Sequence, residues 1–230
     1  MEIKPIAHIK TDFKEKFGIP RQSGIIEEIK GEIIFEKQYQ NPDALRGIEK
    51  YSHIWLIFDF SKNHRDNFLP TVRPPRLGGN THIGVFATRS PFRPNNLGLS
   101  FVKLEGIKKT ENSGFTLLVS GVDLLDNTPI FDIKPYIPYC DCKPYAKGSF
   151  DEIFKDYKIK VSYDSEKFKN IPKEILNQII KIIEQNPAPS YKKSTENYKF
   201  LFSNYEICFE LNEDTAKILS IEKNIKLRCL

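Results

Sequence analysis

The sequence predicts a mainly β protein in which a compact antiparallel β-barrel is followed by a small α+β domain. The first part of the chain holds successive short runs of β-branched and aromatic residues, bounded by Gly, Pro or Asn. No ten-residue helical period separates these runs, which argues against a βαβ nucleotide-binding fold. A clear amphipathic helical pattern appears only later in the chain. We therefore expect a barrel domain over residues 1–145 and an α+β domain over residues 146–230.

The expected elements of the first domain follow from these runs. A strand pattern covers residues 6–9, 24–35, 52–60, 82–87, 97–107, 115–125 and 128–137. The run 24–35 also fits a hairpin that turns at Lys30-Gly31. Asn41-Pro42 is typical of a helix start, with Asn as the N-cap and Pro at the first helical position, so residues 42–49 are expected to form two helical turns.

The second domain is predicted to be a helix followed by strands. Residues 171–186 carry five apolar side chains at helical spacing, with Pro172 near the start and Pro187 just past the end. Strand-like runs follow at 197–202 and 205–211, joined by Ser203-Asn204, with a third at 215–221.

Composition indicates a soluble globular protein. The chain has 230 residues, 40% of them hydrophobic, and can bury a substantial core. It has no apolar run long enough to span a membrane and no secretory signal pattern, so we expect a cytoplasmic protein with no membrane contact. Its four cysteines lack zinc-site spacing, so free thiols and no metal are expected.

An arginine-rich loop is the first candidate for chemistry. Four of the eight arginines, Arg73, Arg76, Arg89 and Arg93, lie between Asn67 and Leu104, a stretch without Asp or Glu. Its prolines and glycines indicate a defined backbone shape. Guanidinium groups match carboxylates and phosphates, so the loop is predicted to hold a ligand's carboxylate or to follow a nucleic-acid backbone. The alternative is a surface loop with solvated arginines.

Three aspartates form the second candidate. Asp123, Asp126 and Asp132 fall within VDLLDNTPIFDIKPYIP, with a turn expected at residues 127–129. Their spacing matches no calcium loop, and magnesium is the weaker interpretation. They are better suited to accept hydrogen bonds from a ribose or an adenine amino group, or to balance the basic loop. The motifs GxGxxG, GxxxxGK[ST], GxSxG and HExxH are absent from the sequence.

Three strings together resemble a known family. RGIEKYSHIWLIFDF (46–60), RPPRLGGNTHIGVFATRSPFRPNNLGLS (73–100) and VDLLDNTPIFDIKPYIPYCD (122–141) are similar to the bacterial TsaA/TrmO family. Its members are tRNA adenosine-37 N6-methyltransferases that act on threonylcarbamoyl-adenosine. The resemblance covers residues 3–145 strongly and 146–230 more weakly. It implies a SAM-binding (S-adenosylmethionine-binding) β-barrel, a tRNA anticodon loop as partner, and a homodimer that helps to build the site.

The resemblance also implies site residues. SAM contacts are expected from Pro20, Arg21, Gln22, Ser61, Lys62, Arg89, Leu99, Asp123, Leu124, Leu125, Asp126 and Thr128. The acid-free composition of the arginine-rich loop, rather than the resemblance, makes Arg93, Arg73 and Arg76 the expected substrate contacts. Arg89 and Arg93 are candidates to hold SAM or the threonyl carboxylate of the substrate. The polar pair Ser61-Lys62 differs from the residues usual in the family, so contacts there are expected to be made by the backbone.

A string in the second domain completes the expected site. The family carries D-P-x-P-x-Y-R, and this chain has Asn186-Pro187-Ala188-Pro189-Ser190-Tyr191-Lys192 at the matching place. The resemblance implies catalytic roles for Asn186, Tyr191 and Lys192, of which Tyr191 matches the family. Asparagine cannot act as a base, and lysine lacks bidentate geometry. Two alternatives therefore stay open: a SAM enzyme that acts on another RNA position or a small substrate, and a non-catalytic RNA-binding barrel.

Overall fold

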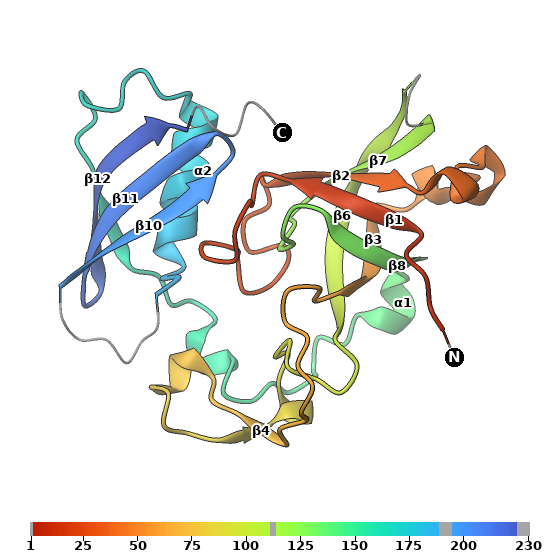
Figure 1. Ribbon diagram of the computed structural model, residues 1–230, viewed down its shortest axis with the longest axis horizontal. Coiled ribbons are helices and arrows are strands. Elements are labelled where there is room, and N and C mark those ends of the chain that lie inside the picture. The colour runs from red at the N-terminus through yellow and green to blue at the C-terminus, as the bar shows by residue number, and fades with distance from the viewer. Residues whose placement is uncertain (1, 111–113, 189–194, 225–230) are drawn as a thin grey trace.

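A closed six-stranded barrel forms the first part of the chain, as predicted (Figure 1). The computed structural model describes residues 2–110, 114–188 and 195–224. The barrel strands are β1 (Ala7–Thr11), β2 (Lys30–Phe35), β3 (His53–Asp59), β6 (Leu97–Thr110), β7 (Gly114–Ser120) and β8 (Thr128–Pro135). They follow one another in the order β1, β2, β7, β6, β3, β8, and every neighbouring pair is antiparallel. Closure pairs the edge strands that an open sheet would expose.

Buried residues alternate with partly covered ones along the strands, and the buried ones form the barrel core. In β3, Ile54, Leu56 and Phe58 are buried, and the residues between them are only partly covered. The long strand β6 has a register shift between Leu104 and Gly106, where an extra residue lets the strand bend around the barrel. At its other end, Gly98 lies opposite Phe58, and a Cβ atom there would overlap the Phe58 ring. The chain therefore needs glycine where β6 enters the barrel.

Several predicted elements differ from the structure. The expected hairpin at 24–35 is wrong, because only Lys30–Phe35 is a strand. The expected helix at 42–49 is two short 3-10 turns, which Gly47 separates with a φ of 91°. Asn41 nevertheless caps the first turn, since its side chain accepts a hydrogen bond from the Asp43 N–H at 3.0 Å.

The loops around the arginines also contain less strand than expected. Of the run 82–87, only β5 (Ile83–Gly84) is a strand, and it pairs with the short β4 (Thr71–Val72). The strand expected at 115–125 ends at Ser120, and the following residues leave the sheet. A short helix, α1 (Pro138–Asp141), closes the first domain. Residues 61–96, with β4 and β5, form a separate lobe below the barrel in Figure 1, which we call the arginine lobe.

The second domain packs one helix against a four-stranded sheet. Helix α2 (Lys173–Glu184) buries Ile179, Ile182 and Ile183. The sheet contains β10 (Glu196–Phe202), β11 (Tyr205–Asn212), β12 (Thr215–Lys223) and β9 (Lys160–Ser162), in the order β10, β11, β12, β9. The α+β prediction is confirmed, and β9, which runs parallel to β12, was not predicted.

The two domains share one continuous apolar core. Phe13, just after β1, bridges to Phe202 of β10, and their ring centroids are 5.3 Å apart. The Gln178 side chain on α2 donates to the Glu28 carbonyl at 3.0 Å. The boundary between residues 145 and 146 stays a prediction, since the barrel strands end at Pro135 and the next sheet begins at Lys160.

Candidate functional site

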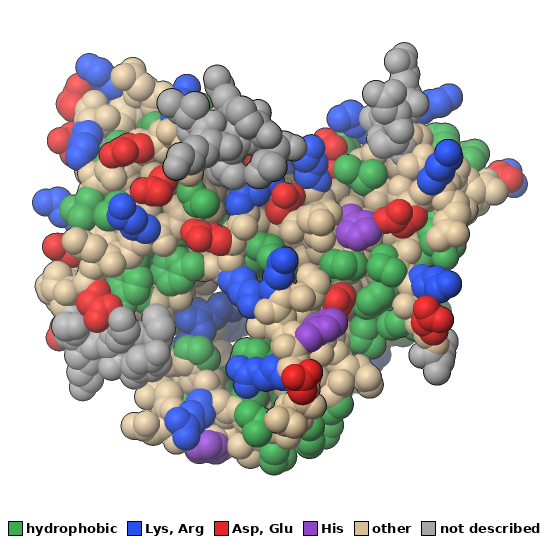
Figure 2. All heavy atoms as spheres, viewed as in Figure 1, with side chains coloured by type: hydrophobic (Ala, Val, Ile, Leu, Met, Phe, Trp, Pro, Cys, Tyr) green, Lys and Arg blue, Asp and Glu red, His purple; other side chains and the backbone are tan. Residues whose placement is uncertain are grey.

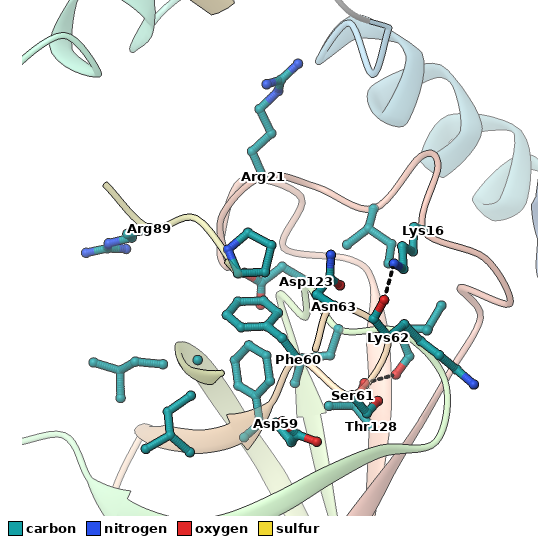
Figure 3. A pocket seen from close by; sticks show the side chains of 18 of the residues that line it. Lys16, Arg21, Asp59, Phe60, Ser61, Lys62, Asn63, Arg89, Asp123 and Thr128 are labelled. Carbon is teal, nitrogen blue, oxygen red and sulfur yellow. Dashed lines mark hydrogen bonds between the residues drawn. The ribbon is translucent and has the colours of Figure 1, made fainter. Parts of the chain in front are cut away.

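A cavity of about 580 Å³ opens where β3 and β6 meet the loops at one end of the barrel. Five segments form its walls, of which 88–93 and 97–99 are close in the sequence and the others lie far apart. The five segments are residues 16–22 after β1, 58–63 at the end of β3, 88–93 in the arginine lobe, 97–99 at the start of β6, and 123–128 before β8. Figure 3 shows these side chains coming from separate strands and loops, with those of Arg21 and Arg89 extending away from the rest. A volume of this size is typical of small-molecule and cofactor sites.

The cavity gathers nearly all the expected cofactor residues. Its lining includes Pro20, Arg21, Gln22, Ser61, Lys62, Arg89, Leu99, Asp123, Leu124, Leu125 and Thr128. Antiparallel pairing of β3 with β6 places Ile57 opposite Leu99 and Asp59 opposite Leu97, which brings the segments after Asp59 and before Leu97 together. The lining residues that sequence reasoning missed include Lys16, Phe58, Asp59, Phe60 and Asn63. The aromatic residues among them belong to an apolar strand, so no local signal distinguishes them from core residues.

Asp123 is the notable acid of this cavity. Its carboxylate accepts a hydrogen bond from the Ser100 hydroxyl of β6. Removal from water in the cavity raises the pKa of Asp123 to about 6, against the lowering effects of Ser100, nearby main-chain N–H groups and Arg89. The ionised carboxylate therefore lacks full compensation, and a ligand that donates a hydrogen bond to it would supply some.

Among the described residues that line the cavity, cations outnumber acids. The basic ones are Lys16, Arg21, Lys62, Arg89 and Arg93, and the acidic ones are Asp59 and Asp123. Asp59 already has a partner, because the His64 Nε2 lies 2.7 Å from its carboxylate. Arg89 donates to the Gln22 side chain, which ties the arginine lobe to the loop after β1. The site is thus suited to an anionic group.

Arg21 lies at the side of the cavity that faces the second domain. In Figure 3 it extends away from the other labelled side chains. Its guanidinium donates to the Asn186 carbonyl at 3.3 Å. Burial, and then the neighbouring charge of Arg76, lower the pKa of Arg21 to about 10. Figure 2 shows Lys and Arg side chains around the hollow between the two domains.

Asp126 does not line the cavity, unlike the other residues expected to contact SAM. One of its carboxylate oxygens accepts from the Thr11 N–H at 2.9 Å, and the other lies 2.8 Å from Lys14 Nζ. The next residue, Asn127, has a φ of 61°, so the chain turns there and directs Asp126 toward β1. In the structure Asp126 holds the turn before β8.

The three arginines expected to bind substrate have different surroundings. Arg93 lines the cavity, and its guanidinium donates to the carbonyls of Val85 and Thr88 at 3.1 and 2.8 Å. Arg73 donates to His82 within the arginine lobe at 3.0 Å and is absent from the cavity lining. Arg76 is also absent from the lining.

Arg76 instead connects the arginine lobe to the second domain. It donates to the carbonyls of Phe154 and Gln185 at 3.3 and 3.4 Å, and its guanidinium lies over the Tyr157 ring. Burial lowers the pKa of Arg76. In this structure it joins the lobe to the end of α2.

Asn186 is the described member of the expected catalytic string. It follows the end of α2 with a φ of 47°, a conformation that asparagine tolerates well at the end of a helix. Its side chain is buried, donates to the Tyr157 hydroxyl at 3.3 Å and does not line the cavity, while its amide oxygen has no hydrogen-bond partner among the described residues. Tyr191 and Lys192 lie outside the described residues. The catalytic roles of all three stay predictions.

Within residues 2–110, 114–188 and 195–224, no three His, Cys, Asp or Glu side chains group closely enough to hold a metal ion. None of the helices in those ranges is long and apolar enough to cross a membrane. The described cysteines Cys140, Cys142 and Cys208 are free thiols.

Known proteins are similar to this chain in both of its domains. The family model for the tRNA-methyltransferase O N-terminal domain matches residues 8–142, and the model for the TrmO C-terminal domain matches residues 156–224. A tRNA (adenine(37)-N6)-methyltransferase from Escherichia coli (strain K12) is 38% identical over 208 residues, which is 86% of each chain. A protein of the same description from Eikenella corrodens is 41% identical over 173 residues, 74% of this chain and 97% of that protein.

Solved structures share the fold over both domains. The crystal structure of TrmO from Pseudomonas aeruginosa superposes with a TM-score of 0.76 at 28% identity and covers 97% of both chains. A second crystal structure of TrmO has a TM-score of 0.74 at 30% identity and covers 96% of this chain and 98% of that one. With both family models matched in order and relatives aligned over most of its length, this chain belongs to the tRNA-methyltransferase O family.

Proposed function

We propose that this protein transfers a methyl group from SAM to N6 of adenosine 37 in tRNA, with the cavity at the end of β3 and β6 as its SAM site. The observation that supports this most is the cavity lining, which includes every expected SAM residue except Asp126. The relatives described as tRNA (adenine(37)-N6)-methyltransferases support N6 of adenosine 37 as the atom that accepts the methyl group.

The chemistry of the lining fits SAM. The Asp123 carboxylate is an acceptor for ribose hydroxyls or for an adenine amino group. Phe58, Phe60 and Leu124 offer apolar surface for a nucleoside ring. Arg89 offers a guanidinium for the carboxylate of the methionine part. SAM supplies an electrophilic methyl group on a sulfonium.

The residues of this chain act by binding and positioning. Transfer requires the acceptor nitrogen to lie in line with the bond that breaks, so fixed walls that hold both reactants contribute most of the catalysis. The hydrogen bonds of Arg93 to Val85 and Thr88 fix the backbone of the arginine lobe beside the cavity. The proton on N6 has to leave as the new bond forms, and a positioned base accelerates that loss.

The acceptor we propose is the threonylcarbamoyl form of adenosine 37. Its carboxylate suits the excess of cations in the cavity, where five basic side chains face two acids. In this acceptor N6 is already acylated and its lone pair is delocalised, so proton loss matters more than in plain adenosine. We assign recognition of the anticodon loop to lysines of the second domain, and we further propose a cytoplasmic homodimer.

The test is nucleoside mass spectrometry of tRNA incubated with SAM and the purified protein. Two tRNA samples are compared, one that carries threonylcarbamoyl-adenosine at position 37 and one that carries plain adenosine. We expect the methylated product only from the first. Methylation of plain adenosine, or of another position, refutes the acceptor assignment. SAM binding without any RNA product points to a different substrate, and RNA binding without SAM binding points to a non-catalytic barrel.

A further inference from the structure

An exposed aromatic patch lies on the arginine lobe. Phe86 is 72% exposed, Phe68 53% and Leu69 51%, and the rings of the two phenylalanines stack with centroids 6.3 Å apart at 26°. We call these three residues the aromatic patch. Figure 2 shows hydrophobic side chains gathered on the lobe below the barrel, where Figure 1 labels β4. Exposing stacked phenylalanines to water is costly, so the patch is a candidate interaction surface.

The patch is held by an ordered backbone. Val85 is buried, and its N–H donates to the Pro70 carbonyl at 2.9 Å, which joins the segment of Phe68 to the segment of Phe86. The Arg93 guanidinium donates to the Val85 carbonyl from the opposite side. A turn anchored in this way directs Phe86 outward, whereas its neighbour Val85 points into the fold.

The patch is directly connected to the cavity. The Arg93 guanidinium lies over the Phe86 ring, 5.8 Å from its centroid, and Arg93 also lines the cavity. Thr88 and Arg89, only two and three residues beyond Phe86, line the cavity as well. A ligand that fills the cavity and continues outward past Arg93 therefore reaches the patch.

The charge around the patch favours a polyanion. Residues 67–104 contain four arginines and no Asp or Glu, and Asp66 is the acid nearest to Phe68 in the sequence. Arg65 stacks over the Phe92 ring at 3.6 Å and adds a fifth guanidinium to the lobe. Aromatic rings among arginines are the usual means of holding unstacked bases of single-stranded nucleic acid, since stacking and phosphate contacts act together.

A second copy of the chain suits this surface less well. A twofold contact brings the same surface of both copies together. Here that would place the arginines of one lobe against those of the other, without an acid in residues 67–104 to offset them.

We propose that the aromatic patch is a stacking platform for RNA bases that flank the target adenosine. When one adenine enters the cavity, it leaves the stack of the loop, and its neighbours lose a stacking partner. Phe86 and Phe68 replace that partner at the rim of the cavity. This inference rests on the proposed function, because it takes the occupant of the cavity to be a nucleotide of an RNA loop.

The experiment compares Phe86→Ala with Phe86→Tyr and with Tyr139→Ala. Tyr139 is 87% exposed on α1, so its removal is a matched loss of an exposed aromatic ring away from the patch. Binding of tRNA is measured by fluorescence anisotropy, SAM binding by calorimetry, and KM for tRNA by methyl transfer. We expect Phe86→Ala to raise the Kd and KM for tRNA by about 5- to 150-fold, as for one lost base stack. Its Kd for SAM stays unchanged, and Phe86→Tyr and Tyr139→Ala behave like the wild type.

Two results would contradict the proposal that the aromatic patch is a stacking platform. One is a Phe86→Ala protein that binds tRNA as the wild type does. The other is a Phe86→Ala protein that sediments as a monomer where the wild type is a dimer, which assigns the patch to a second copy. The anisotropy measurement does not depend on methyl transfer. If the wild type binds tRNA through Phe86 but transfers no methyl group, the proposed function fails while the platform stands.

Discussion

Replacing Asp123 with asparagine is expected to stabilise the protein at alkaline pH and to weaken SAM binding. The ionised Asp123 carboxylate destabilises the folded protein, because removal from water raises its pKa from 3.8 to about 6. Asparagine keeps the shape and removes the charge. The same change removes the ionised acceptor that we assign to SAM, so stability and binding should move in opposite directions.

The magnitude follows from the pKa shift. A group whose folded-state pKa is raised binds its proton more tightly in the folded protein, so ionisation destabilises the fold. Below the ordinary pKa of 3.8 the carboxyl is protonated in both states, and the wild type loses stability as the pH rises from there to about 6. The full loss is about 3 kcal/mol at 1.36 kcal/mol per unit. Asparagine does not reproduce every contact of the protonated acid, which costs about 1 kcal/mol of this. We therefore expect Asp123→Asn to raise the free energy of unfolding by about 2 kcal/mol at about pH 8.

The assay is thermal unfolding of both proteins at about pH 5 and about pH 8. A gain of about 2 kcal/mol corresponds to a Tm higher by about 4–8 °C in a chain of this size. The gap in stability should fall to about 0.6 kcal/mol, roughly a third, at about pH 5, because the carboxyl of the folded wild type is mostly protonated one unit below its pKa of about 6. Calorimetry with SAM at about pH 8 should show binding weaker by about tenfold or more, as for a lost charged hydrogen bond. A pH-independent gap in Tm, or a variant less stable than the wild type at about pH 8, contradicts the account of Asp123.

Three other substitutions test the site and its supports. Arg89→Ala should abolish methylation and leave the protein folded, with at most about 1 kcal/mol of stability lost with its hydrogen bond to Gln22. Wild-type turnover by this variant contradicts the role of Arg89. Gly98→Ala should destabilise the barrel by about 1–3 kcal/mol in chemical denaturation, because the new Cβ overlaps the Phe58 ring. Gly84→Ala is the matched control, since a Cβ there meets open space and should not destabilise the protein in this way. Arg76→Ala removes two hydrogen bonds to carbonyls of the second domain, so hydrogen exchange near the end of α2 should quicken while the barrel amides stay protected. Equal exchange in both proteins argues against Arg76 as a connection.

The barrel was predictable because its strands carry a strong local signal. In β3, buried and partly covered residues alternate over seven positions, and the β-branched and aromatic content agrees with that period. The same signal misleads where apolar residues are buried by loops. Val85 is buried in a 3-10 turn, and Val122 and Leu124 are buried after β7 has ended, so the runs that contain them have the apolar pattern of strands without being strands.

The site was predictable from family motifs more than from residue chemistry. The local pattern predicts an anion-binding loop in the arginine lobe, and the resemblance assigns the expected SAM contacts to particular residues of the candidate site. Neither approach indicated the direction of Asp126, because a turn at Asn127 decides which side of the chain its carboxylate faces. Arg76 was expected at the substrate for its charge, yet its position between the lobe and α2 depends on how the two domains pack. The two residues that Arg76 contacts are 78 and 109 positions away, and spacing along the chain does not reveal contacts of that kind.

The most direct test of the central claim is methyl transfer from isotopically labelled SAM to tRNA, followed by digestion and mass spectrometry of the nucleosides. The wild type and Arg89→Ala are compared on tRNA that carries threonylcarbamoyl-adenosine. The account predicts label on N6 of the nucleoside at position 37 with the wild type and none with the variant. Label at any other atom, or equal labelling by both proteins, contradicts it.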